Sequence, residues 1–248
     1  MTVPADGVLF IHAFPMDARM WDGQVAALDG SWPTVAPSLP GFGGSDDAGP
    51  TMTMGAAADR CLRAADEIGL ERMVVCGLSM GGYVAFELWR MARQRVAGIV
   101  LANTRSGADA REAADGRRAL ADRLESEGNG FMVEAPPPLL SSDAPPAMWA
   151  QVRETIAEQP APSIAAAARG MAQRKDSTPD LSAIDVPVLI VTSDADTLIA
   201  PEVSLAMAEH IPGAQQVTLA GGGHLSNLEV PEAFDEALRA FLEGFQRI

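Results

Sequence analysis

Short apolar runs alternate with helical stretches along most of this chain, and that alternation restricts its fold more than any other feature. Apolar runs rich in β-branched residues are typical of strands that are buried on both faces. Such runs fall at 8–11, 73–76, 99–102, 188–191 and 216–219, with a shorter candidate at 35–37. Because helical stretches separate them, we predict one α/β domain with a mostly parallel sheet and helices on both faces.

The helical stretches form two groups. Those at 54–68 and 80–93 alternate with the strands, and near the end of the chain one apolar stripe of a last helix contains Phe234, Leu238, Phe241, Leu242 and Phe245. The segment 105–179 breaks the alternation, because it is rich in alanine and charge, has helical periodicity and contains proline clusters. We predict that it is a helical cap inserted into a core of residues 1–104 and 180–248. An insertion there lies where open sheets bind ligands, so we expect the cap to act as a lid.

The charge balance disfavours two kinds of partner. The 248 residues carry 18 basic and 33 acidic side chains, and the formal net charge of −15 repels nucleic acid and anionic membranes. No apolar run approaches the roughly 20 residues that span a bilayer, and no secretory signal is recognisable. We therefore expect a cytoplasmic, soluble protein that acts on a small molecule. The sequence leaves open whether it is a monomer or a homodimer.

Metal and disulfide chemistry have little support in the sequence. The two cysteines, Cys61 and Cys76, lie in contexts typical of buried thiols. The pair Asp194 and Asp196 has no nitrogen or thiolate ligand close by in the sequence. We predict neither a metal site nor a cofactor.

The strongest functional signal is the segment CGLSMGG, which contains the pattern G-x-S-x-G. It directly follows a strand pattern and directly precedes a helix pattern, which is the context of a nucleophile elbow. Gly77 and Gly81 allow a tight turn that exposes the serine, and the helix N-terminus faces developing negative charge. We predict that Ser79 is a nucleophile. For the pentapeptide alone, a glycine-rich turn with a capping serine is the alternative.

A serine nucleophile needs a base, and the chain has three histidines. His224 follows three glycines after the last strand pattern and is the predicted base. His210 ends a helical stretch and suits the negative end of its dipole, while His12 is expected to brace the loop after the first strand. The acid that orients the base should follow another strand, so Asp196 is the predicted acid and Asp194 the reserve.

The oxyanion of such a reaction needs two backbone N–H groups. One should belong to the residue after the nucleophile and the other to the loop after the first strand, which indicates Met80 and Phe14. Arg105, just beyond the strand at 99–102, is typical of a surface ion pair, with an acidic substrate group as the alternative. Apolar side chains that could line the substrate pocket, or equally belong to the core, are Phe14, Leu78, Leu139, Leu140, Met148, Trp149 and Leu198.

The chain resembles the α/β-hydrolase superfamily over nearly its whole length, through HAFPMDARMW, LPGFGGS, GLSMGGYVAFE, SDADTLIAP and GGGHLSNLEVPEAF. The order Ser79, Asp196, His224 is also that of the superfamily. Within it the chain is most similar to small capped esterases and lactonases such as 3-oxoadipate enol-lactonases, whose elbow is also GLSMGG. Haloalkane dehalogenases carry an aspartate at the position of Ser79 and are disfavoured. Ala13 departs from the glycine that many relatives have after the histidine.

The resemblance implies an α/β-hydrolase fold whose sheet has about six strands, all or nearly all parallel. The two antiparallel strands that commonly begin the superfamily's sheet are expected to be missing, because the chain starts almost at the strand before the oxyanion loop.

Together these observations predict a serine hydrolase that cleaves a small carboxylic ester, thioester or lactone through an acyl-enzyme on Ser79. A C–C bond hydrolase and a cofactor-free haloperoxidase or perhydrolase would use the same residues and remain open. A non-catalytic receptor for a small ligand is the alternative of a different class, because a fold does not determine a function.

Overall fold

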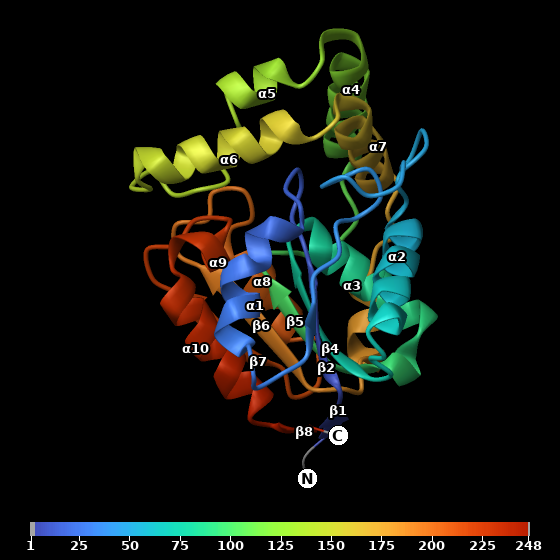
Figure 1. The fold of residues 1–248 in the computed structure, drawn as a ribbon, viewed down its shortest axis with the longest axis vertical. Helices are drawn as coiled ribbons and strands as arrows, with labels where there is room; N and C mark the ends of the chain where they lie inside the picture. The colour runs from blue at the N-terminus through green and yellow to red at the C-terminus, as the bar shows by residue number, and fades with distance from the viewer. Residues whose placement is uncertain (1–2, 248) are drawn as a thin grey trace.

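A six-stranded parallel sheet lies at the centre of the computed structural model, which describes residues 3–247 (Figure 1). The strand order is β3-β2-β4-β5-β6-β7, and each neighbouring pair is parallel. The strands are β2 (Gly7–Ile11), β3 (Thr34–Val35), β4 (Met73–Leu78), β5 (Val96–Ala102), β6 (Val188–Ser193) and β7 (Gln215–Leu219). The predicted parallel sheet of about six strands is confirmed.

Helices cover both faces of the sheet, as predicted. Figure 1 shows α1 (Asp22–Leu28) and α10 (Pro231–Leu242) on one face, and α2 (Met54–Glu67) and α3 (Met80–Met91) on the other. Helix α8 (Pro201–Ala208) packs against β6, and the short α9 (Ser226–Glu229) leads into α10. Every residue of β2, β4, β5 and β6 is buried, which explains why these strands are continuous apolar runs.

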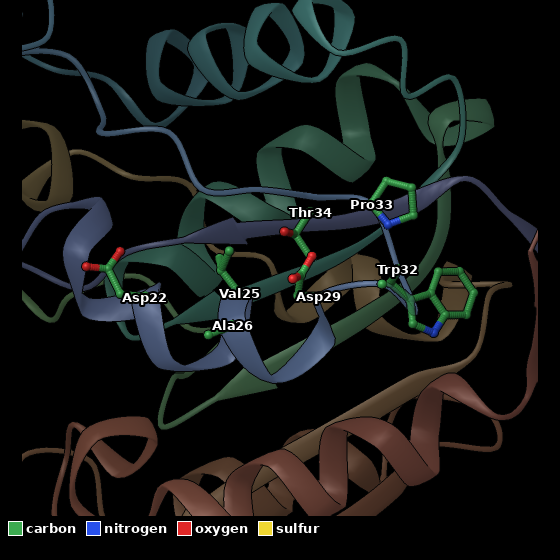
Figure 2. Close-up of a pocket in the computed structure, with 8 residues that line it drawn as sticks. Asp22, Val25, Ala26, Asp29, Trp32, Pro33 and Thr34 are labelled. Atoms are coloured by element: carbon green, nitrogen blue, oxygen red, sulfur yellow. The ribbon is translucent and has the colours of Figure 1, made fainter.

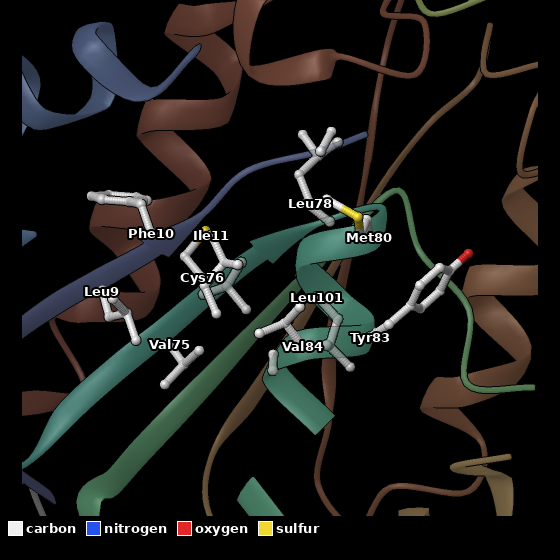
Figure 3. Close-up of a cluster of buried hydrophobic side chains, with 14 of the residues drawn as sticks. Leu9, Phe10, Ile11, Val75, Cys76, Leu78, Met80, Tyr83, Val84 and Leu101 are labelled. Atoms are coloured by element: carbon white, nitrogen blue, oxygen red, sulfur yellow. The ribbon is translucent and has the colours of Figure 1, made fainter. Parts of the chain in front are cut away.

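The centre of the core lies between β2, β4 and α3. Figure 3 shows Leu9, Val75 and Val84 among the buried side chains there. Leu78 and Met80, on either side of the elbow serine, also belong to this cluster and are fully buried. The elbow is therefore held by a densely packed part of the molecule.

A second, two-stranded sheet joins the two ends of the described chain. Strand β1 (Val3–Ala5) pairs in parallel with β8 (Phe245–Arg247). The prediction that Phe245 continues the apolar stripe of the last helix is wrong, because α10 ends at Leu242 and Phe245 lies in a strand. Its ring packs over Gly98, where a Cβ atom would lie only 2.5 Å from the ring. Phe245 lies four residues after Phe241, a spacing that fits a continuing helix, but the chain leaves the helix before it reaches Phe245.

The segment between β5 and β6 carries four helices at the carboxyl end of the sheet (Figure 1). They are α4 (Arg111–Glu127), α5 (Gly130–Glu134), α6 (Pro146–Glu158) and α7 (Ala161–Ala172). Helix α4 packs on α7, and α5 packs on α6. We call these four helices and their connections the cap. Its boundaries at 105 and 179, and its action as a lid, remain predictions.

The 3-10 helices are Ala18–Trp21, Arg93–Arg95 and Thr178–Ala183.

Hydrogen bonds fasten the cap to the core in separate places. At the end of α6, the buried Gln159 donates from Nε2 to Asp17 Oδ2 at 2.8 Å and accepts from Gly43 N at 2.9 Å. On α7, Ala166 O accepts from Met52 N at 3.0 Å. Between α5 and α6, Leu139 O accepts from Leu225 N at 2.8 Å. The cap thus contacts the loops after β2, β3 and β7 at the same time.

No helix within residues 3–247 is both long and apolar enough to cross a membrane.

Cys61 and Cys76 are buried, free thiols, as predicted. Burial raises the pKa of the Cys61 thiol to about 12 and also raises the pKa of the Cys76 thiol.

Candidate active site

Ser79 lies on the sharp turn between β4 and α3. Its backbone has φ 57° and ψ −113°, a conformation that residues with a side chain rarely adopt. The turn needs glycine on both sides because a Cβ atom on Gly77 would lie 2.2 Å from Gly81 O, and one on Gly81 would lie 2.1 Å from Ile11 O. Thr104 Oγ1 donates to Ser79 O at 2.7 Å. The turn is the elbow that the G-x-S-x-G pattern predicts.

His224 and Asp196 form a buried pair beyond the carboxyl ends of the strands. His224 Nδ1 lies 2.8 Å from Asp196 Oδ2, and the two residues are 2% and 5% exposed. Burial works to raise the pKa of Asp196, but the hydrogen bond and charge of His224 and the N–H groups around the carboxyl outweigh it, so the net pKa is lowered. An ionised carboxylate only accepts hydrogen bonds. Nδ1 of His224 therefore carries the proton, and Nε2 is left as the basic nitrogen.

Each oxygen of the Asp196 carboxylate accepts two hydrogen bonds. Oδ1 accepts from the backbone N–H groups of Leu198 at 2.9 Å and Ile199 at 3.0 Å. Oδ2 accepts from His224 and from Asn103 Nδ2 at 2.9 Å. Four N–H donors therefore determine the position of the acid. Asp194, the reserve candidate, is not part of this arrangement and accepts from Gly221 N at 2.7 Å instead.

A polar network that the sequence did not reveal supports the pair. The buried Asn103 donates to Ser193 Oγ at 2.7 Å, and its Oδ1 accepts from Ser226 Oγ at 2.6 Å. Ser193 Oγ in turn donates to Gly223 O at 2.6 Å, next to His224 in the chain. The ends of β5 and β6 are thereby joined to the histidine loop. Asn103 also has a positive φ of 44°, which asparagine tolerates better than most residues.

Ser79 and His224 line one cavity of about 190 Å³ beneath the cap. No hydrogen bond joins the Ser79 hydroxyl to the imidazole within residues 3–247, and such catalytic bonds are often long without substrate. The cavity lining combines core and cap residues: Phe14, Ser79, Tyr83, Arg105, Arg117, Leu120, Pro137, Leu139, Met171, Leu198, Ile199 and His224.

The predicted lining residues divide between this cavity and other places. Phe14, Leu139 and Leu198 line it. Leu78 is fully buried in the core behind the elbow. Leu140 and Trp149 border a different hollow, beside Ala195 and Thr197, and Met148 packs on the core without lining the cavity. Helical periodicity does not specify which face of a cap segment turns toward the sheet, so it could not separate Leu139 from Leu140.

A broader hollow of about 700 Å³ lies elsewhere, between α1 and β3 (Figure 2). Asp22 and Asp29 line it together with Trp32 and Thr34. Among the described residues, no histidine lines this hollow, and neither Ser79 nor His224 reaches it. The smaller cavity at Ser79 is the candidate active site.

The two predicted oxyanion donors belong to different segments of the chain. Met80 is the first residue of α3, and Phe14 follows β2 and lines the cavity. Among residues 3–247, neither backbone N–H donates to another residue. Both N–H groups are thus available for a ligand, and their role as oxyanion donors remains a prediction.

His12 braces the loop that carries Phe14, as predicted. The ring is fully buried; Nδ1 lies 2.9 Å from Ala13 O, and Nε2 accepts from Leu39 N at 3.0 Å. Burial lowers the pKa of His12 to about 4. The ring is therefore neutral at physiological pH, and it is not available as a second base because its Nε2 lone pair already accepts from Leu39 N. His210 is exposed, and its Nδ1 lies 2.8 Å from Ala206 O in the last turn of α8.

The lowered pKa of His12 predicts a loss of stability in mild acid. At this site the unfolded chain binds a proton below about pH 6.5, whereas the folded protein binds one only below about pH 4. The free energy of unfolding therefore has its full value above pH 6.5 and decreases as the pH drops toward 4. His12→Gln keeps an acceptor for Leu39 N–H and removes the titration. Between pH 7 and 4.5, we expect wild type to lose about 2–3 kcal/mol more than the variant in urea unfolding.

The matched control for this experiment is His210→Gln, which removes an exposed histidine. Equal losses of unfolding free energy in wild type and His12→Gln over this pH range would contradict the assignment of a neutral, buried imidazole.

Glu229 joins the histidine loop to the cap. Its Oε2 accepts from Gly223 N at 2.9 Å and from Ser141 N at 3.0 Å, and its Oε1 accepts from the Ser141 hydroxyl. The carboxylate therefore holds the residue before His224 against the segment that contributes Leu139 to the cavity.

We expect Glu229→Gln to lower the free energy of unfolding by about 1–3 kcal/mol, because the amide nitrogen would face an N–H donor. Chemical denaturation measures the change. Glu232→Gln, at an exposed position on α10, is the control. A Glu229→Gln variant as stable as that control would show that the bridge contributes nothing.

A serine on a strained elbow at the carboxyl edge of a parallel sheet, sharing a cavity with a histidine that a buried carboxylate holds, is the arrangement of α/β-hydrolases. The comparison with family models agrees, since the alpha/beta hydrolase family matches residues 8–237. The chain belongs to that family of enzymes.

Several characterised proteins are similar to it. 3-Oxoadipate enol-lactonase 1 of Acinetobacter baylyi is 29% identical over 98% of this chain and 90% of its own. A thermophilic esterase from Thermogutta terrifontis superposes with a TM-score of 0.92 at 38% identity, covering 97% of this chain and 89% of the esterase. The enol-lactonase from Burkholderia xenovorans superposes with a TM-score of 0.86 at 25% identity, covering 96% and 92%.

Proposed function

We propose that this protein is a serine hydrolase that cleaves a small carboxylic ester, thioester or lactone through an acyl-enzyme on Ser79. The observation that carries the proposal is the shared cavity of Ser79 and His224, in which Asp196 holds the proton on Nδ1 of the imidazole. The similarity to an esterase and to enol-lactonases supports the same class of bond.

The reaction would proceed in two halves. Nε2 of His224 takes the proton of the Ser79 hydroxyl as the oxygen attacks the carbonyl carbon, and the N–H groups of Phe14 and Met80 bind the oxyanion. The proton then passes from His224 to the leaving alcohol or thiol. A water molecule, deprotonated by the same nitrogen, attacks the acyl-enzyme and releases the acid and Ser79. Asp196 keeps its negative charge throughout and stabilises the imidazolium.

The first test is hydrolysis of p-nitrophenyl esters of increasing acyl length, with and without a serine-directed fluorophosphonate. We expect turnover that falls with longer acyl chains, because the cavity has only about 190 Å³. The fluorophosphonate should abolish turnover and, with loss of fluoride as HF, add the mass of its phosphonyl group to the peptide containing Ser79. Turnover that persists after labelling, or labelling at another residue, would contradict the proposal.

A further inference from the structure

Arg105 is a charged residue of the cavity that the proposed mechanism does not use. It follows β5 by three residues, and its side chain lines the cavity together with Ser79 and His224. Within residues 3–247, its guanidinium has no ion pair and no hydrogen bond to another residue, and its Nε is buried. The expectation of a surface ion pair at Arg105 is therefore wrong.

A buried donor without a partner is uncommon and calls for a physical reason. The other buried, unpartnered side-chain atoms of the described residues belong to side chains that do not line this cavity, for example those of Trp21, Trp89 and Thr192. A donor placed beside the predicted nucleophile can be satisfied by a molecule bound in the same cavity. The position of Arg105 thus indicates a ligand.

The charges near Arg105 favour an anion. Arg117 also lines the cavity, and its Nε donates to Asp109 Oδ2 at 2.5 Å. The same carboxylate forms an ion pair with the buried Arg174, whose guanidinium lies 4.0 Å from the centre of the Tyr83 ring. Asp109 is therefore shared between two cations and does not reach Arg105. Among the described residues, no aspartate or glutamate lines the cavity, although the chain as a whole has a formal charge of −15.

We propose that the substrate of this site carries a carboxylate and that Arg105 binds it while the reacting carbonyl lies against Ser79. This inference rests on the proposed hydrolase function. The planar guanidinium can donate two parallel N–H bonds to a carboxylate, which fixes both the position and the orientation of a substrate. A cavity of about 190 Å³ has room for on the order of six water molecules, so the substrate is a short-chain acid that also contains an ester or lactone bond.

Matched pairs of esters test the proposal, because each pair differs only in charge. Monomethyl glutarate is compared with its carboxamide, methyl 4-carbamoylbutanoate, which places the test group on the acyl side. O-Acetylglycolate is compared with O-acetylglycolamide, which places it on the alcohol side. We expect the wild-type protein to prefer the carboxylate in at least one pair by about ten- to hundredfold in kcat/KM, the size of one charge-assisted hydrogen bond.

Variants of Arg105 then decide whether this residue is the cause. Arg105→Met should reduce the carboxylate preference to near one, and Arg105→Lys should retain part of it, because lysine keeps the charge without the paired donors. Since the ratio is taken within each variant, a general loss of activity cancels. The control is Arg118→Met, which removes an equal charge from an exposed position on α4 and should leave the ratio unchanged.

A binding experiment separates failure of this inference from failure of the proposed function. Calorimetry with glutarate and glutaramide needs no turnover, and Arg105→Met should weaken glutarate binding at least about tenfold without weakening glutaramide. If no ester is hydrolysed, the proposed function fails, and glutarate binding alone decides on the anion site. A wild type without preference in either pair, a preference that survives Arg105→Met, or glutarate binding that this variant does not weaken would overturn the inference.

Discussion

We expect Ser79→Ala to lower kcat for short p-nitrophenyl esters by on the order of 10⁵-fold or more, because it removes the atom that forms the acyl-enzyme. The residual rate would reflect binding and oxyanion donors alone. The variant should fold normally, since alanine has the same Cβ as serine and the Ser79 hydroxyl makes no hydrogen bond with another residue within 3–247. Steady-state kinetics and a thermal unfolding curve check both parts.

The interpretation of Ser79→Ala depends on the thermal unfolding curve. A variant that loses activity and also melts at a much lower temperature would reveal a damaged elbow and say little about chemistry. A variant that keeps the wild-type melting temperature together with substantial turnover would remove Ser79 from the mechanism.

The second large effect is expected for Asp196→Asn, which should lower kcat by about 10⁴-fold. Each carboxylate oxygen accepts from two N–H groups, so an amide NH₂ in either position would face two donors. Where that NH₂ faces His224, the imidazole has to carry its proton on Nε2, and the nitrogen that should act as base is then blocked. The same change is expected to destabilise the protein, because a buried N–H would lose its acceptor.

Asp194→Asn is the matched control for this experiment. Asp194 lies two residues away, and among the described residues its side chain binds only the backbone N–H of Gly221, so we expect its replacement to change kcat by less than about tenfold. Steady-state kinetics of the two variants measured side by side decide between the carboxylates. Similar losses of kcat for both variants would mean that changes anywhere in this segment disturb the loop of His224, and that Asp196 has no special role as the acid.

The parallel sheet and the elbow were predictable because their physical signals are local. A strand covered on both faces has to be apolar along its whole length, as at β4 and β5, and the turn at Ser79 excludes any side chain at Gly77 and Gly81. The pair of His224 and Asp196 was predictable from position, since both residues follow strands whose carboxyl ends meet at one edge.

Contacts that short polar residues and the cap make with distant segments were not predictable. Asn103, Ser193 and Ser226 are short polar residues with no periodicity of their own, and only the folded chain brings them together around Asp196. The orientation of the cap segment also depends on contacts with distant residues. The sequence therefore could not show that Leu139 lines the cavity and Leu140 does not. Phe245 has the spacing of a helical stripe, but β1 provides it with a strand partner.

The separate attachments of the cap also bear on how substrate enters and product leaves. A segment held at Gln159, at Ala166 and at Leu139 cannot swing about one end without breaking hydrogen bonds at the others. We expect exchange with solvent to depend instead on exposed side chains that line the cavity, such as Leu198. Rotations of exposed side chains take picoseconds to nanoseconds, whereas hinge motions take microseconds to milliseconds. We therefore expect the attached cap to admit substrate through rotations of side chains, which are faster than a hinge motion of the whole cap.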